Sequence, residues 1–160
     1  MVIDIESIEV EQIKIKPGER ALVLKAALMI PLVEIWVRVS GFQRCRNSLQ
    51  GLAGFLNGRK PENKKDLEQA QRIAGLVDIA NRRYSVYLCD CLTQSLVVQY
   101  FLTRQQIPSE LRVGVRTITG QFESHTWVEH SGVALNEPES VRKIYTEFDC
   151  KKSSPSTGNR

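Results

Sequence analysis

Hydrophobic positions follow a helical spacing over the first part of the chain. The apolar stretch at residues 19–39 predicts a helix that Pro31 kinks or splits in two, because proline lacks the N–H that a helix interior requires. Residues 43–63 predict a weak helix followed by a polar loop, and residues 90–105 predict another apolar helix. Between these, apolar residues recur at steps of three and four from Asp66 onward, at Leu67, Ala70, Ile73, Ala74, Val77 and Ala80.

After Ile107-Pro108 the period changes from helical spacing to strict alternation. Residues 111–118 alternate apolar with polar or small residues, which predicts a strand, and Gly120 predicts a turn. Residues 124–130 and 133–137 predict two more short strands joined by a tight hairpin, and residues 140–148 form a last amphipathic piece. Helices followed by strands predict an α+β fold, in which N-terminal helices precede a small antiparallel sheet.

The two ends of the chain lack such clear patterns. Residues 1–18 alternate apolar and charged positions and fit either a strand pair or a short helix, whereas residues 151–160 are too polar to fold. A chain of 160 residues is long enough for one ordinary core. We therefore expect one domain over 1–150, with an uncertain segment at 1–18, a helical subregion at 19–65 and a core at 66–148 that holds the candidate chemistry, followed by a disordered tail at 151–160.

Composition and charge exclude several classes of function. The chain has 22 Lys and Arg against 18 Asp and Glu, and this small excess is dispersed, so we expect no nucleic-acid partner. Lys25, Glu34 and Arg38 interrupt the apolar stretch at 19–39, so we expect no membrane span. The N-terminus is acidic where a secretory signal is basic. We therefore expect a cytoplasmic protein with free thiols at all four cysteines, Cys45, Cys89, Cys91 and Cys150.

Two of these cysteines flank Asp90 at the head of the helix predicted over 90–105. If Asp90 caps that helix, Cys91 lies in its first turn, where the helix dipole and free backbone N–H groups stabilise a thiolate. Cys89 lies just before the helix and lacks this advantage. The spacing does not match the usual zinc or redox motifs, so we expect neither a metal nor another cofactor. On the residues alone, the alternative to a nucleophilic Cys91 is that Cys91 is an inert core residue.

A nucleophilic thiol requires a base, and the chain has two histidines. His125 lies within a predicted strand, whereas His130 falls in the hairpin loop, where we expect it to be exposed to solvent. His125 is therefore the candidate base. An acid or amide is then needed to orient its imidazole.

The hairpin loop decides which residue can orient His125. A three-residue loop, His130-Ser131-Gly132, pairs Glu129 with Val133 and places Glu137 opposite His125. A two-residue loop shifts the register by one, so that Asn136 shares the face of His125 and Glu137 turns away. We favour the longer loop, and with it Glu137, because glycine occupies the position at which such loops turn left-handed. Asn136 remains the alternative.

Three stretches in this order resemble the lasso-peptide leader peptidases of the McjB-like family, which have a transglutaminase-like, papain-like catalytic domain. They read CLTQSL at 91–96, IPSELRVGV at 107–115 and HTWVE at 125–129, and the resemblance extends over about residues 19–148. The family pattern has alanine where Thr126 stands and often glycine where Gln106 stands. Many relatives have aspartate at the position of Glu137.

The resemblance implies a cysteine protease that removes the leader from a ribosomally synthesised precursor by thiolate attack at the leader–core junction. It assigns the nucleophile to Cys91, the base to His125 and the third member to Glu137. It also implies a separate leader-binding protein and a lactam synthetase as pathway partners, and leaves any need for ATP open. The alternatives are a transglutaminase-like acyltransferase acting on a peptide and a catalytically inactive peptide-binding scaffold.

Overall fold

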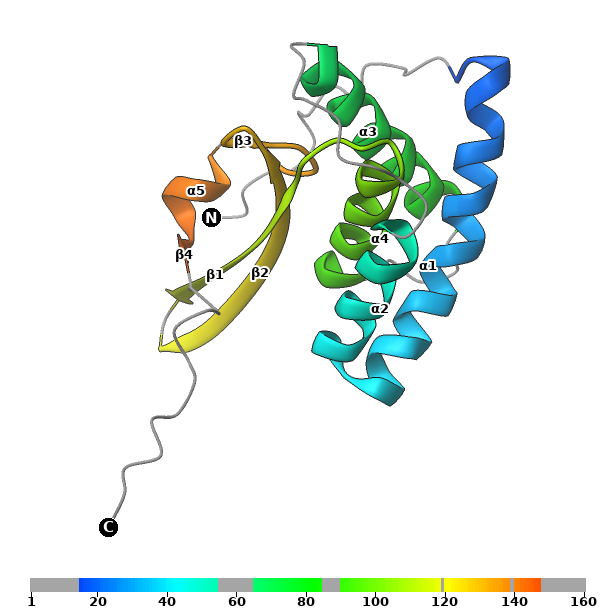
Figure 1. Cartoon of the computed structure of the whole chain (residues 1–160). Helices are drawn as coiled ribbons and strands as arrows, with labels where there is room; N and C mark the ends of the chain where they lie inside the picture. The colour runs from blue at the N-terminus through cyan, green and yellow to red at the C-terminus, as the bar shows by residue number, and fades with distance from the viewer. Residues whose placement is uncertain (1–14, 55–64, 85–89, 119, 139, 148–160) are drawn as a thin grey trace.

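The computed structural model describes residues 15–54, 65–84, 90–118, 120–138 and 140–147. Helices in these ranges form one layer and the strands form a sheet beside it (Figure 1), which confirms the predicted α+β fold. Predictions for residues 1–14, for the loop within 55–63, for Cys89 and for the tail at 151–160, together with Cys150, lie outside the described residues.

The helical layer begins with a short 3₁₀ turn, η1 (Pro17–Glu19), which leads into α1 (Arg20–Ser40). Helices α2 (Phe42–Gly54), α3 (Lys65–Tyr84) and α4 (Cys91–Arg104) complete the layer. Their buried apolar side chains form a shared core to which β2 contributes Val128. Most of the stripe predicted on α3 is buried in this core, from Ala70 to Ala80.

Pro31 neither splits the first helix nor ends it. Helix α1 runs without interruption through Pro31, so the predicted split into two helices is wrong. Pro31 is exposed, so its ring does not disturb the buried side of the helix, although the carbonyl four residues earlier loses its helical donor. In the described ranges, no helix is long and apolar enough to span a bilayer.

The described strands form one antiparallel sheet in the order β3-β2-β1-β4. Strands β1 (Glu110–Ile118) and β2 (Gln121–His130) pair along their whole length, with Gly114 opposite His125. Strand β3 (Val133–Ala134) extends one edge, and β4 (Thr146–Glu147) pairs with β1 at the other. The piece predicted over 140–148 divides into the short helix α5 (Val141–Ile144) and β4.

The hairpin between β2 and β3 has a two-residue loop, so the favoured three-residue loop is wrong. His130 pairs with Val133 and Glu129 with Ala134, while Ser131 and Gly132 both take positive φ values of 49° and 79°. Two successive left-handed residues characterise a type I′ turn, whose twist matches that of the strands it joins. The favoured three-residue loop required a left-handed conformation only at Gly132. In the structure Ser131 is left-handed as well, which is uncommon for serine.

Candidate active site

Cys91 is the first residue of α4 and lies near the edge of the sheet. Asp90 occupies the N-cap position, where its carbonyl accepts the Gln94 N–H at 3.2 Å, but its side chain makes no capping bond. The expected side-chain cap is therefore absent, and N–H groups of the first turn stay available. One of them, from Leu92, donates to the Cys91 thiol.

Among the described residues, no strand lies along the edge of β2 next to Cys91, because β3 pairs only with Glu129 and His130. Side chains and the adjacent loop take the place of that strand. The Val128 N–H donates to Asn136 Oδ1 at 2.8 Å, and Ser95 Oγ donates to the Thr126 carbonyl at 3.0 Å. Asn136 Nδ2 in turn donates to Ser95 Oγ at 3.1 Å.

This network fastens α4 to the open edge of β2. Ser95 lies one turn after Cys91, so it holds the same side of the helix against the strand. The Thr126 N–H on that edge donates to the Cys91 thiol. Ser95 was not predicted as a site residue, although its position four residues after Cys91 puts it on the same side of the helix.

His125 lies between the two other predicted site residues. Its Nε2 is 3.0 Å from Glu137 Oε1, and hydrogen bonding between its ring and the Cys91 thiol raises the pKa of His125 and lowers that of the thiol. Because Glu137 occupies Nε2, the second ring nitrogen, Nδ1, is the one left for the sulfur. The His125 and Glu137 side chains retain 21% and 29% exposure, so the cluster is accessible from solvent.

Glu137 contacts His125 although the hairpin has the register expected to turn it away. Strand β3 ends at Ala134, and one more backbone bond, from Leu135 N–H to the Val128 carbonyl, continues the pairing. At the next bond the Asn136 side chain replaces a strand carbonyl, so the chain leaves the sheet there. Alternation along a strand therefore no longer determines where Glu137 points. Asn136, the alternative orienting residue, bonds to β2 and α4 and makes no described bond with His125.

Aromatic rings flank the imidazole of His125. The Tyr145 ring stacks against it with centroids 5.1 Å apart, and the Trp127 ring lies nearly parallel to it with centroids 6.4 Å apart. The Arg116 guanidinium lies over the Tyr145 ring, 4.7 Å from its centroid. Tyr145 was not predicted, because it lies between two very short elements, the C-terminus of α5 and the start of β4.

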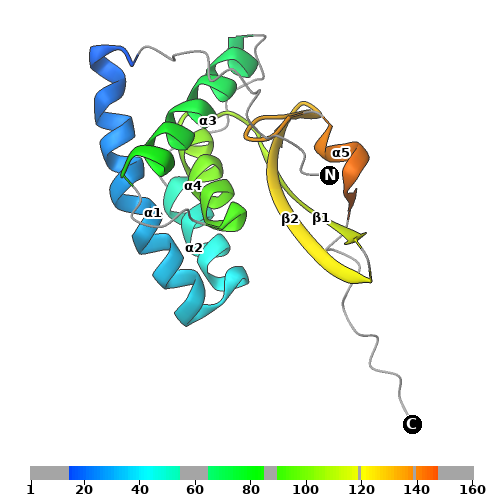
Figure 2. The same cartoon turned by 180° about the vertical axis from the view of Figure 1, so that it is seen from behind.

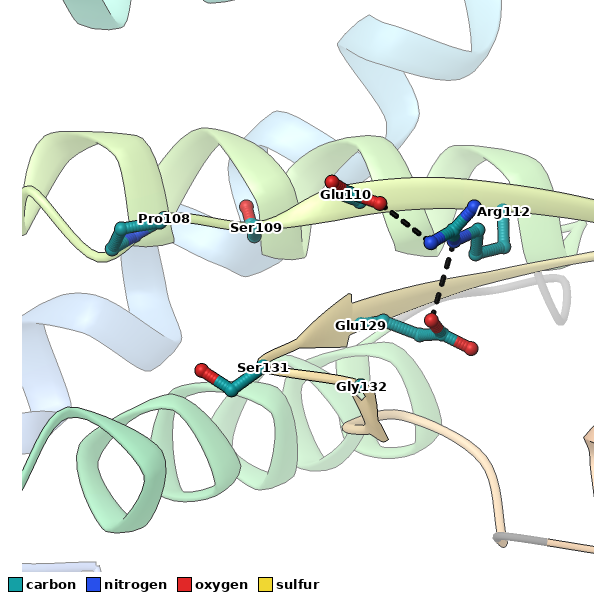
Figure 3. A pocket seen from close by; sticks show the side chains of 7 residues that line it. All are labelled: Pro108, Ser109, Glu110, Arg112, Glu129, Ser131 and Gly132. Carbon is teal, nitrogen blue, oxygen red and sulfur yellow. Dashed lines mark hydrogen bonds and ion pairs between the residues drawn. The ribbon is translucent and has the colours of Figure 1, made fainter. Parts of the chain in front are cut away.

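A buried carboxylate holds Trp127 in turn. The Trp127 Nε1–H donates to Glu129 Oε1 at 2.9 Å, and Glu129 is only 2% exposed. Arg112 and Arg142 neutralise this carboxylate at 3.2 and 3.3 Å. Figure 3 shows Arg112 between Glu129 and the exposed Glu110, beside a cavity of about 300 Å³. Cys91, His125 and Glu137 do not line that cavity, so Glu129 supports His125 only through Trp127.

His130 is buried, so the expected exposure in a loop is wrong. It is the last residue of β2, is 3% exposed and bonds through Nδ1 to the Pro108 carbonyl at 2.6 Å. A carbonyl only accepts, so this bond requires a proton on Nδ1. His130 therefore anchors the segment that leads into β1 and lies apart from Cys91.

Comparison with known proteins shows the family of this chain. The family model of the transglutaminase-like superfamily matches residues 32–148, which is most of the chain. The chain belongs to the transglutaminase-like superfamily. It is also similar to the microcin J25-processing protein McjB of Escherichia coli, with 36% identity over 58 residues, which cover 36% of this chain and 27% of that protein. A search of solved structures gives no significant match.

The electrostatics of this transglutaminase-like site favour an ion pair between Cys91 and His125. Burial alone would raise the pKa of the Cys91 thiol, but the hydrogen bonds from His125 and from the Thr126 and Leu92 N–H groups lower it below its ordinary value. Hydrogen bonds with Cys91 and then Glu137 raise the pKa of His125 to about 10. The pair is charged between these two pKa values.

The ion pair predicts how alkylation of Cys91 depends on pH. The thiolate is present above the lowered pKa of Cys91, so reaction with iodoacetamide should stay fast below the range in which ordinary thiols react. Replacing Glu137 by Gln removes an anion that raises the pKa of His125, so His125 should lose its proton at a lower pH than in the wild type. Without the positive imidazolium beside it, Cys91 should form its thiolate only at a higher pH. Alkylation at neutral pH should then slow by about tenfold.

Mass mapping of each cysteine-containing peptide after timed alkylation tests this expectation. Cys45 is an internal control, because it is fully buried and burial raises its pKa, so it should react slowest at every pH. A Cys91 profile unchanged by Glu137→Gln would show that Glu137 does not act on the thiol through His125.

Proposed function

We propose that this chain is a cysteine peptidase that removes the leader from a ribosomally synthesised lasso-peptide precursor. The observation that carries the proposal is the contact of Cys91 with His125, whose other nitrogen is 3.0 Å from Glu137. Family membership supports peptide acyl chemistry, and the similarity to a microcin-processing protein supports a peptide precursor as the substrate. The matched region spans about a quarter of that relative. The substrate and the partners of this chain are therefore proposed along with its activity.

In the proposed mechanism His125 first takes the thiol proton of Cys91. The thiolate attacks the carbonyl carbon at the leader–core junction, and the backbone N–H of Cys91, which has no helical acceptor, is placed to donate to the oxyanion. The C–N bond then breaks, and His125 gives its proton to the departing amine of the core peptide. Water, deprotonated by His125, attacks the thioester and releases the leader carboxylate and the thiolate.

Glu137 and the aromatic rings act on His125 in this mechanism. Glu137 fixes the ring orientation through Nε2 and stabilises the imidazolium, while Tyr145 and Trp127 restrict rotation of the ring. A separate leader-binding protein is proposed to deliver the precursor, and a lactam synthetase to use the released core. Delivery by a partner lowers the barrier because it converts an encounter into a positioned reaction.

Cleavage in ¹⁸O-labelled water tests hydrolysis against acyl transfer. The precursor peptide made by the same biosynthetic pathway is incubated with this chain and the leader-binding protein, with an added primary amine, and the products are weighed. Hydrolysis should put one ¹⁸O into the new leader carboxylate and none into the core peptide. A leader fragment that carries the amine would establish acyl transfer instead. An intact precursor that is bound but never cut would establish the inactive scaffold.

A further inference from the structure

Helix α1 has an apolar row on its outer side that the described residues leave uncovered. Its five aliphatic side chains are between 61% and 81% exposed, whereas large apolar side chains on a monomer surface usually occur singly. We call the following residues the outer row: Leu24, Leu28, Leu32, Ile35 and Val39.

The outer row faces away from the core of the protein. The buried side of α1 carries Val23, Ala26, Ile30 and Val33, which lie on the opposite side of the helix at 100° per residue. Figures 1 and 2 both place α1 at the rim of the helical layer, with α3 and α4 between it and the sheet. The outer row therefore contributes neither to the core nor to the candidate active site.

The spacing of the outer row suits a second helix packed along it. Its members follow one another at steps of four, four, three and four residues, which keeps them on one narrow strip. Such a strip offers the ridges and holes into which the side chains of a neighbouring helix fit. At 1.5 Å per residue, α1 is about 31 Å long, enough for several turns of a partner.

The margins of the outer row are basic. Arg20 and Arg38 are about five turns apart and share one margin, while Lys25 lies on the other, and all three are exposed. Glu34 lies farther from the outer row than Arg38 does and is less exposed than Arg38. Its carboxylate forms an ion pair with Arg38 at 2.6 Å. A surface that docks here is therefore favoured if it carries carboxylates beside its own apolar residues.

The same margins disfavour a second copy of this chain. In an antiparallel two-fold pairing of α1, each margin faces its own counterpart, so Arg20 and Arg38 of one copy meet Arg38 and Arg20 of the other. In a parallel pairing, Lys25 faces the margin of the two arginines. Both arrangements bring like charges together at the edge of an apolar contact.

An anionic membrane would also meet basic margins, but the composition of the outer row does not favour it. Helices that lie in the membrane interface typically insert aromatic side chains with their leucines. The outer row is wholly aliphatic, and Trp36 lies beside it at 39% exposure. A narrow aliphatic strip with three- and four-residue steps fits a helix better than it fits a lipid surface.

The geometry points to the outer row as a docking surface for an amphipathic helix of a partner protein, whose apolar residues are flanked by Asp or Glu. This inference does not depend on the proposed peptidase activity, because it uses no residue of the candidate active site. It adds an interaction surface on the side of the helical layer remote from the sheet.

Two synthetic helices test the surface with the full-length chain. Both carry the same leucine row at steps of four, four, three and four, and the flanking positions are Glu in one peptide and Lys in the other. Fluorescence anisotropy should show that the Glu-flanked peptide binds at least tenfold tighter, with an affinity that falls as salt rises. Leu28→Glu and Leu32→Glu should each weaken binding at least tenfold, and Lys25→Glu should reduce the preference for the Glu-flanked peptide.

Leu52→Glu is the matched control, because Leu52 is an equally exposed leucine, at 59%, on α2. It should leave peptide binding unchanged, and circular dichroism should show the same helix content in all variants. Equal binding of both peptides, or of neither, would overturn the inference. So would binding to phosphatidylserine vesicles without peptide binding, or a dimer in sedimentation that Leu28→Glu dissolves.

Discussion

Replacing Cys91 by Ala should reduce precursor cleavage by about 10⁴-fold or more, to the uncatalysed background, while the fold is retained. The reason is that this substitution removes the only sulfur that contacts His125 among the described residues, and no neighbouring group there can form the thioester. Cys91 is partly exposed at the start of α4, so losing its sulfur leaves little cavity and should cost little stability. Cleavage is measured by mass spectrometry and stability by thermal unfolding.

The other cysteines provide controls for this loss. Cys45→Ala removes a fully buried thiol that is remote from His125 in the fold, so it should lower stability modestly and leave cleavage per folded molecule unchanged. Cys89→Ala should also leave cleavage nearly intact, since only Cys91 lies in the first turn of α4. Cleavage that survives Cys91→Ala but disappears with Cys89→Ala would mean that the nucleophile had been assigned to the wrong thiol.

A double variant separates a shared mechanism from two independent contributions. If Cys91 and His125 act as one unit, Cys91→Ala combined with His125→Ala should be no slower than Cys91→Ala alone. Peptide binding should persist in both, because the network from Ser95 to Asn136 uses neither side chain. Losses that multiply in the double variant would argue against a proton passing between these two residues.

Strong periodic patterns made most of the fold predictable from the sequence. The stripes of α3 and α4 and the alternation in β1 depend on many residues each, so a single unusual position does not change the prediction. Pro31 illustrates the limit, because its effect depends on its surroundings, and on α1 this exposed proline is accommodated within one continuous helix. Cys91 and His125 were chosen separately, the first because it lies in the first turn of a helix and the second because the other histidine was expected in the loop, so their proximity was a premise of the hypothesis.

Details of the site that depend on single residues were not predictable in the same way. A glycine at position 132 fits both a three-residue loop and a type I′ turn, and only the left-handed Ser131 distinguishes them. Glu137 reaches His125 because Asn136 interrupts the strand pairing with its side chain, which no alternation rule anticipates. Tyr145 lies between the four-residue helix α5 and the two-residue strand β4, which are too short to leave a pattern.

Gly114→Ala should disturb the candidate active site from the opposite strand. Gly114 pairs with His125, and a Cβ there would lie 2.7 Å from Tyr145 Cβ and 2.8 Å from the Trp127 ring. Neither atom is the free end of a flexible side chain, so the rings that flank His125 must move. Overpacking of this kind costs about 1–3 kcal/mol of unfolding free energy. A shift of the imidazole by about 1 Å should also lower kcat by roughly 100-fold.

The matched control, Gly51→Ala, separates this crowding from a general effect of adding a methyl group. Gly51 lies in α2, and an added Cβ meets nothing within 4 Å, so alanine there should raise stability by about 0.5–1 kcal/mol through the unfolded chain. Both variants are compared by urea unfolding and by cleavage at a temperature at which each is fully folded. Gly114→Ala could lose stability and still cleave at the wild-type rate. That result would mean that the rings beside His125 pack the sheet but do not position the imidazole.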